Sequence, residues 1–459
     1  MRIPPGPSHR PTALAARHIA FALAATVTAA VTVAAVPSRA AAAPSGDSGR
    51  SPKHVLLIDW DGFDPDYLGR VATPNLDALS ERGSLTIGSS TFQTVSNPAR
   101  ASMVTGAYPD THENAAYYLD PASNTVKGQE RNLEAETIAE ALAEEGRTVA
   151  AVQWYMVQDH GTSFGDPEHL YVQPGGDFGD RVDVAIDILH QRPVDSGGIQ
   201  VTVPQVPELL AVYGSDLDEL AHAEGAESPD IGARLVETDA ELGRLVQATK
   251  DVGIYGETAV ILTSDHGMTS WNRTLLPQVL DAVSTAGYVA EVVTPGQSPA
   301  PTTEVVLVPN AVRYGNFYLR GRAATEQGRA DVRAALESMA PAYVAQVLDD
   351  ADLEAMRASD KLGDLIAEAQ PPYAFALTEP PAGQTRGAHG STQELAVPFL
   401  LSGAGVCRGA VPASPSLVDV APTIAALLGV TPPDDVEGRV LTEALDPQSS
   451  PGAASPTGR

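Results

Sequence analysis

Short apolar runs alternate along the chain with segments whose apolar residues recur at helical spacing. Short apolar runs bounded by turn-forming residues are typical of buried strands, and helical spacing that stops at a glycine is typical of helices. The predicted strands are residues 54–60, 148–152, 259–263 and 394–401, and the predicted helices are residues 73–83, 132–145 and 419–428. Because strands alternate with helices, we expect an α/β fold, with a mostly parallel sheet flanked by helices on both faces.

Residues 271–385 depart from this alternation. They contain a proline-rich loop at 295–301 and an acidic stretch with helical character at 323–364. This change of pattern predicts an inserted, cap-like segment, and an ordinary surface excursion is the alternative. We therefore expect one main domain over residues 54–445 that includes this segment.

The N-terminal region has the features of a targeting signal. Arg2, Arg10 and Arg17 precede an apolar run over 19–36, and small residues follow as far as Ala43. This pattern predicts a secretory signal peptide over residues 1–43, with an uncleaved membrane anchor as the alternative. We expect a secreted, extracellular protein without stable membrane association after cleavage. The polar segment 44–53 is interpreted as a linker, and the Ser/Pro/Gly-rich tail 446–459 is expected to be disordered.

Charge and cysteine content narrow the classes of function. The chain has 459 residues, with 58 acidic residues against 29 Lys and Arg, and its formal net charge is −29. Such a protein is repelled by polyanions, so we do not expect it to bind a nucleic-acid polymer. The single cysteine, Cys407, excludes an internal disulfide and a cysteine-based zinc site.

Carboxylates and histidines follow several predicted strands. Asp61 comes after the first strand and Asp265 and His266 after the third, while Asp218 and His222 are four residues apart, on one face if that turn is helical. The carboxyl ends of parallel strands share an edge of the sheet, so these side chains could converge there. With His389 from a glycine-rich loop, they are ligands that suit zinc, manganese or iron. The alternative is a capping aspartate and structural loop histidines.

A hydroxyl nucleophile is predicted at Ser96. It stands at the start of a helix expected over 98–104, where the backbone amides and the helix dipole favour an anion. Metal coordination can activate a hydroxyl that is otherwise a poor nucleophile. Arg100 lies four residues further on and could reach the same anion, and a structural ion pair is the alternative.

In this order, the motifs resemble those of the alkaline phosphatase superfamily, in particular its type I phosphodiesterase/nucleotide pyrophosphatase branch. The resemblance covers most of the chain after the signal, and the nucleophile position, ten residues before Gly106 of the Val-Thr-Gly-x-Tyr-Pro motif, falls on Ser96. The matching segments are Asp61-Gly62-Phe63, Asp218-x-x-x-His222, Ser264-Asp265-His266-Gly267-Met268 and Gly387-Ala388-His389-Gly390.

The resemblance implies an alkaline-phosphatase-like fold and two zinc ions. It places one ion on Asp218, His222 and His389, and the other on Asp61, Asp265, His266 and the Ser96 oxygen. It also implies hydrolysis of a small phosphoric ester, with a phosphoseryl intermediate on Ser96.

Two departures from the branch leave alternatives open. The phosphate-binding asparagine of the branch falls on Tyr117 by ungapped count, and Asn114 is close but out of register, so both are candidate substrate-binding residues with Arg100. The segment from Ser96 to Arg100 also resembles the sulfatase signature, in which the serine becomes formylglycine. A sulfatase or a phosphomonoesterase therefore remains an alternative to the phosphodiesterase.

Overall fold

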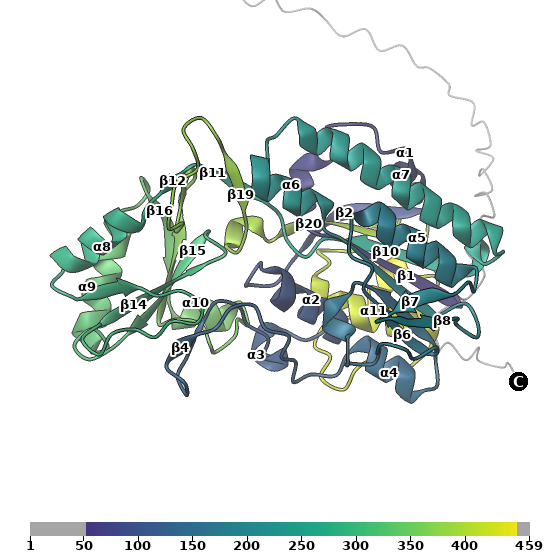
Figure 1. The fold of residues 1–459 in the computed structure, drawn as a ribbon, viewed down its shortest axis with the longest axis horizontal. Coiled ribbons are helices and arrows are strands. Elements are labelled where there is room, and N and C mark those ends of the chain that lie inside the picture. The colour runs from purple at the N-terminus through teal and green to yellow at the C-terminus, as the bar shows by residue number, and fades with distance from the viewer. Residues whose placement is uncertain (1–51, 448–459) are drawn as a thin grey trace, which may run out of the picture. The chain divides into compact units, whose positions relative to one another are not determined.

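The computed structural model describes residues 52–447 (Figure 1). The expected signal peptide, most of the linker and nearly all of the tail therefore lie outside the described residues. Among residues 52–447, no helix has both the length and the apolar character needed to cross a membrane.

The main domain is built on a seven-stranded sheet. Its order is β2 (Gly83–Ser89), β20 (Ala396–Gly403), β10 (Thr258–Thr263), β1 (His54–Trp60), β9 (Leu209–Gly214), β5 (Val149–Val152) and β6 (His169–Val172). The strand β20 pairs antiparallel with both of its neighbours, and every other pairing in the sheet is parallel. The predicted mostly parallel sheet is confirmed.

Helices cover both faces of this sheet, as predicted (Figure 1). Alternate residues of β1 point to opposite faces, so Val55 and Leu57 belong to one hydrophobic cluster and Leu56 and Ile58 to another. One face is covered by α2 (Ser96–Thr105), α4 (Ile138–Glu144) and α11 (Val420–Leu428), and the other by α1 (Pro74–Ser80), α5 (Phe178–Leu189) and α7 (Asp230–Asp251). Burial on both faces explains why the strands read as continuous apolar runs.

Two predicted helix boundaries differ from the structure. The helix expected over 132–145 begins at Ile138, because Thr137 caps it and Glu140 bonds back to the Thr137 amide. The helix expected to stop at Gly83 ends at Ser80, and Gly83 instead opens β2. A Cβ at Gly83 would lie 1.9 Å from the Leu401 carbonyl oxygen of β20, so only glycine fits this close pairing.

The segment 271–385 contains a second sheet. Its order is β13 (Ala290–Val292), β14 (Val305–Asn310), β15 (Tyr314–Leu319), β17 (Leu365–Ala369) and β16 (Val344–Leu348). It packs with α8 (Leu276–Thr285) and α9 (Glu326–Glu337) around a hydrophobic cluster of its own. The acidic stretch expected to be helical holds α9 and α10 (Asp350–Ala355), with the unforeseen strand β16 between them. A capping role for this segment stays a prediction.

Pairs of short strands and two short helices lie outside the two larger sheets. They are the pairs β3 (Leu119–Asp120) with β4 (Thr125–Val126), β7 (Val194–Ser196) with β8 (Ile199–Val201), β11 (Thr269–Trp271) with β19 (Arg386–Ala388) and β12 (Arg273–Thr274) with β18 (Tyr373–Ala374), and the helices α3 (Pro109–His112) and α6 (Asp216–Glu224).

Candidate active site

The topology brings the predicted metal ligands to one edge of the main sheet. Asp61 follows β1, and Asp265 and His266 follow β10, which is the parallel neighbour of β1. Asp218 and His222 lie on α6, directly after β9, the other parallel neighbour. The carboxyl ends of these three strands therefore deliver carboxylate and imidazole groups to the same place. Ser96 opens α2, and His389 follows β19.

Three histidines present the same ring nitrogen to this place. The Nδ1 atoms of His222, His266 and His389 lie 2.9, 3.0 and 2.8 Å from the carbonyl oxygens of Gly387, Gly267 and Thr94. Because a carbonyl oxygen can only accept, each Nδ1 carries a proton and donates it. Nε2 is then the ring nitrogen of each histidine that faces the site and would bind a metal ion, which is the arrangement that orients histidine ligands of metals.

Asp218, His222 and His389 form the first group of converging ligand atoms. The His222 Nε2 lies 3.3 Å from Asp218 Oδ1 and 3.2 Å from His389 Nε2, and one ligand atom of each residue lies within 4.8 Å of the others. The Asp218 Oδ1 atom is buried and has no hydrogen-bond donor. An orphaned carboxylate oxygen beside two imidazole nitrogens is a donor set that fits a divalent ion.

The pKa values of His222 and His389 show where this first group favours a positive charge. Burial alone would lower the pKa of His222, but the Asp218 carboxylate outweighs burial and raises that pKa to about 9. The pKa of His389 is held well below its usual value, first by burial and then by the neighbouring His266 and His222. Within the group, a cation is therefore favoured next to Asp218.

A second group contains Asp61, His266 and Ser96. The His266 Nε2 lies 3.3 Å from both Asp61 Oδ1 and Ser96 Oγ, and Asp61, His266 and Asp218 also place ligand atoms within 4.8 Å of one another. The Asp61 Oδ1 atom is buried without a hydrogen-bond donor. This donor set also fits a divalent ion, and it places the Ser96 hydroxyl beside it. The rings of His266 and His389 stack at 3.6 Å, so the two groups adjoin.

Arg100 lies beneath the second group rather than in an open cavity. Its side chain is 2% exposed; Nε lies 2.6 Å from Asp59 Oδ2, and one terminal nitrogen binds Asp61 and lies 2.9 Å from Asp265 Oδ2. The structure thus shows the ion pair that the sequence left as the alternative to anion binding. Burial raises the pKa of Asp265, whereas for Asp61 Arg100 and His266 outweigh burial and hold the pKa below its usual value.

Two residues that support the site were not identified from the sequence. The Tyr213 hydroxyl donates to Asp61 Oδ2 at 2.6 Å, and its ring faces the Arg100 guanidinium at 4.0 Å. The Thr94 carbonyl orients His389. Tyr213 pairs with Asp59 across the parallel strands, so the rule that strand ends converge could have identified it. Thr94 contributes only a backbone atom and has no sequence signal.

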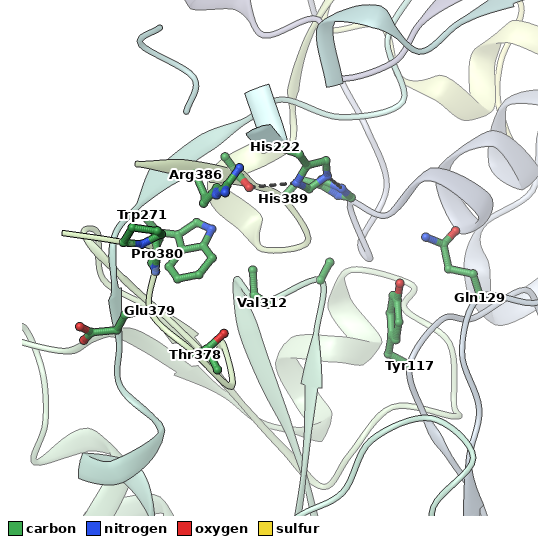
Figure 2. Close-up of a pocket in the computed structure, with 13 residues that line it drawn as sticks. Tyr117, Gln129, His222, Trp271, Val312, Thr378, Glu379, Pro380, Arg386 and His389 are labelled. Carbon is green, nitrogen blue, oxygen red and sulfur yellow. Dashed lines mark hydrogen bonds between the residues drawn. The ribbon is translucent and has the colours of Figure 1, made fainter. Parts of the chain in front are cut away.

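A pocket of about 590 Å³ opens beside the first group (Figure 2). Tyr117 and Trp271 lie on opposite sides of it, with His222 and His389 at one end. Tyr117 thus lines the pocket. Asn114 does not, because its side chain is fully buried and its amide donates to the carbonyl oxygens of Glu130 and Asn132, at 3.1 and 2.7 Å.

Comparisons with known proteins agree on one family. The family model for type I phosphodiesterase/nucleotide pyrophosphatase matches residues 55–392. An uncharacterised pyrophosphatase/phosphodiesterase of Schizosaccharomyces pombe is 28% identical over 48% of this chain and 46% of its own length. The human bis(5'-adenosyl)-triphosphatase ENPP4 is 23% identical over 84% of this chain and 81% of its own. The chain spans about half the length of the first curated relatives that it matches.

The fold is shared with solved structures. The murine ectonucleotide pyrophosphatase/phosphodiesterase 5 superposes with a TM-score of 0.63 at 21% identity, covering 83% of this chain and 96% of the murine chain. An inactive variant of that murine protein was solved in complex with AMP and gives the same TM-score. This likeness establishes an alkaline-phosphatase-like fold.

Proposed function

Because the chain belongs to the type I phosphodiesterase/nucleotide pyrophosphatase family, we propose that it is a metal-dependent hydrolase of small phosphoric esters. The observation that carries this proposal is the convergence of ligand atoms from Asp61, Asp218, His222, His266 and His389, with the Ser96 hydroxyl 3.3 Å from His266 Nε2. A relative is named as a bis(5'-adenosyl)-triphosphatase, and the murine neighbour was solved with AMP. Both names support a nucleotide-like phosphodiester or pyrophosphate as the substrate class.

Two divalent ions would be held by the two groups, and we propose zinc because the family resemblance implies it and the carboxylate and imidazole ligands suit it. Asp218, His222 and His389 would hold one, and Asp61, His266 and the Ser96 oxygen, with Asp265 beside them, would hold the other. Bound zinc supplies positive charge for the phosphoryl oxygens and lowers the pKa of a coordinated hydroxyl or water. The local positive charge would offset the strongly acidic character of the chain, which has a net charge of −29.

Ser96 is proposed as the nucleophile. Its oxygen forms a bond to phosphorus as the bond to the leaving-group oxygen breaks, which gives a phosphoserine. Water then breaks the bond between phosphorus and the Ser96 oxygen. Ser96 is the first residue of α2, so the free amides of the first helical turn and the helix dipole favour the phosphoryl anion beside it.

The pocket lined by Tyr117 and Trp271 is proposed to receive an organic group of the substrate. Its volume of about 590 Å³ is in the range of small-molecule sites, and it ends at His222 and His389. Tyr117 and Trp271 are aromatic residues on opposite sides of the pocket, which suits a planar or apolar group. We also propose that the enzyme is secreted and acts outside the cell, on the basis of the signal-like segment 1–43.

Three matched nitrophenyl substrates test the reaction class. Bis(4-nitrophenyl) phosphate, 4-nitrophenyl phosphate and 4-nitrophenyl sulfate would each be given to the purified protein as prepared, after chelation, and after zinc is restored. We expect the diester to be hydrolysed fastest, with activity lost on chelation and recovered with zinc. Preference for the monoester would favour a phosphomonoesterase. Sulfate-ester hydrolysis that survives chelation would contradict the proposal and indicate a formylglycine at position 96.

A further inference from the structure

The two ligand groups differ in the presence of a fixed cation. Asp218 Oδ1 lies 3.3 Å from His222 Nε2 and 3.8 Å from His389 Nε2, and within residues 52–447 Asp218 has no Lys or Arg partner. Asp61 and Asp265 instead share the guanidinium of Arg100, which is fully enclosed with them. A buried positive charge is therefore already in contact with Asp61 of the second group and with Asp265 beside it.

Arg100 leaves these two carboxylates with unequal capacity for a metal ion. On Asp61, the Oδ2 atom accepts from Arg100 and from the Tyr213 hydroxyl, and the Oδ1 atom has no donor and faces His266. On Asp265, the Oδ2 atom accepts from Arg100 at 2.9 Å and the Oδ1 atom accepts from the Gly62 amide at 3.3 Å. Asp61 thus keeps a free oxygen, and Asp265 does not.

The converging ligand atoms show the same difference. Around the second group, the residues that place ligand atoms within 4.8 Å of one another are Asp61, Asp218 and His266. Asp265 is not among them. The Asp265 Oδ2 atom lies 3.6 Å from His266 Nε2, further than Asp61 Oδ1 at 3.3 Å. The Asp265 carboxylate is therefore held by the Arg100 guanidinium and the Gly62 amide, and the His266 imidazole lies closer to Asp61.

We propose that Arg100 makes the two metal positions unequal, an inference that rests on the proposed function. The position at Asp218, His222 and His389 binds its ion tightly. At the second position Arg100 competes for Asp61 and Asp265 and repels an incoming dication, so that ion binds more weakly and exchanges. Arg100 is a positioning residue in this arrangement, because it acts through the two carboxylates rather than on the substrate.

The competition between Arg100 and a metal ion for Asp61 and Asp265 is strong because these charges are shielded from water. Arg100 and its carboxylate partners are 0–2% exposed, so water screens their interactions little. Altering a group that holds a metal ligand from behind commonly lowers metal affinity by about 10–100-fold. Arg100 acts in the opposite direction, because it is a cation that competes with the metal for the same carboxylates, so only the size of the effect is taken over. We therefore expect the second zinc ion to bind at least about tenfold more weakly than the first.

Zinc titration of the metal-free protein against a chromophoric chelator tests the inference through binding rather than activity. The wild-type protein should show two dissociation constants that differ by about tenfold or more. The variant Arg100→Met combined with Asp59→Asn removes the guanidinium without leaving Asp59 as an unpaired buried charge. In this double variant the second constant should tighten by about tenfold or more and the first should not change.

Asp59→Asn alone is the matched control, because it keeps Arg100 on Asp61 and Asp265, and its second zinc ion should remain weak. Two equal constants in the wild-type protein would overturn the inference, even if the double variant failed to fold. So would a double variant whose second constant stayed the same or weakened. Failure of the proposed function is distinguishable, since the wild-type protein would then bind no zinc and His222→Ala would change nothing.

Discussion

At the scale of single residues, His112 shows how a buried imidazole is held in its neutral form. Its Nδ1 accepts the amide hydrogen of Asn114 at 3.1 Å, so its Nε2 carries the proton and lies 3.0 Å from the Ser102 hydroxyl oxygen. The side chain is fully buried. Burial lowers the pKa of His112 to about 3, because a charged ring would lose water and face the Asn114 donor.

This low pKa predicts a loss of stability in acid. In the unfolded chain the pKa is about 6.5, so as pH falls the unfolded state takes up the proton first and the free energy of unfolding decreases between pH 6.5 and 3. At pH 4 the cost is about 3 kcal/mol relative to pH 7. Urea unfolding of the metal-free protein at pH 7 and pH 4 measures the decrease in the free energy of unfolding between the two pH values. This decrease should be smaller in the His112→Gln variant than in the wild-type protein, by about 3 kcal/mol. Equal drops in both proteins would refute the assignment.

The sequence predicted individual site residues best where they belong to a recognisable motif. The sequence named Asp61, Asp218, His222, His266 and His389, and the structure places their ligand atoms together. It could not place Arg100 or Asn114, whose partners depend on how distant segments meet. Arg100 has the charge for an anion, yet it is surrounded by carboxylates from the ends of β1 and β10.

At the scale of elements, the site depends on how closely α6 approaches the turn after β1. Gly62 in this turn has φ +66°, and a Cβ there would lie 3.0 Å from both Cα and Cβ of Asp218. The glycine therefore allows the backbone conformation and also the contact that brings Asp218 beside Asp61.

Gly62→Ala is predicted to push α6 away and to weaken zinc binding. Gly69→Ala is the matched control, since Gly69 has φ +78° and a Cβ added there would meet nothing within 4 Å. Both variants carry a backbone strain of about 1–2 kcal/mol, which thermal unfolding would report. Only Gly62→Ala should lower zinc retained after dialysis and the rate of diester hydrolysis. Equal zinc retention in the two variants would contradict the role given to this contact.

The elements that the sequence predicted well are those whose signal is local. The strands expected over 54–60, 148–152 and 259–263 are mainly apolar runs and form β1, β5 and β10, and α11 is bounded by Asp419 and Gly429 as expected. The strand β2 has no such run and was not predicted. The strand β16 was missed because it lies within an acidic stretch and is only partly buried, so its pairing with β17 rather than its own sequence determines it.

At the scale of the whole molecule, the sequence predicted the main sheet and the edge that carries the site. The order of helices and strands was sufficient, because parallel strands in such folds deliver their carboxyl ends to one side. The pocket could not be predicted. Its walls come from segments as distant in sequence as Tyr117, Trp271 and Val312, and Val312 lies between β14 and β15 of the second sheet.

The central claim is that Ser96 performs the reaction beside bound metal. The most direct test is the rate of bis(4-nitrophenyl) phosphate hydrolysis by Ser96→Ala, measured together with its zinc content and thermal stability. The control is Ser338→Ala, at the end of α9, where the hydroxyl donates only to the Ala335 carbonyl oxygen. The account predicts a loss of at least about a thousandfold in rate for Ser96→Ala, with the fold kept and the tightly bound zinc retained. Undiminished hydrolysis by a zinc-loaded Ser96→Ala protein would contradict it.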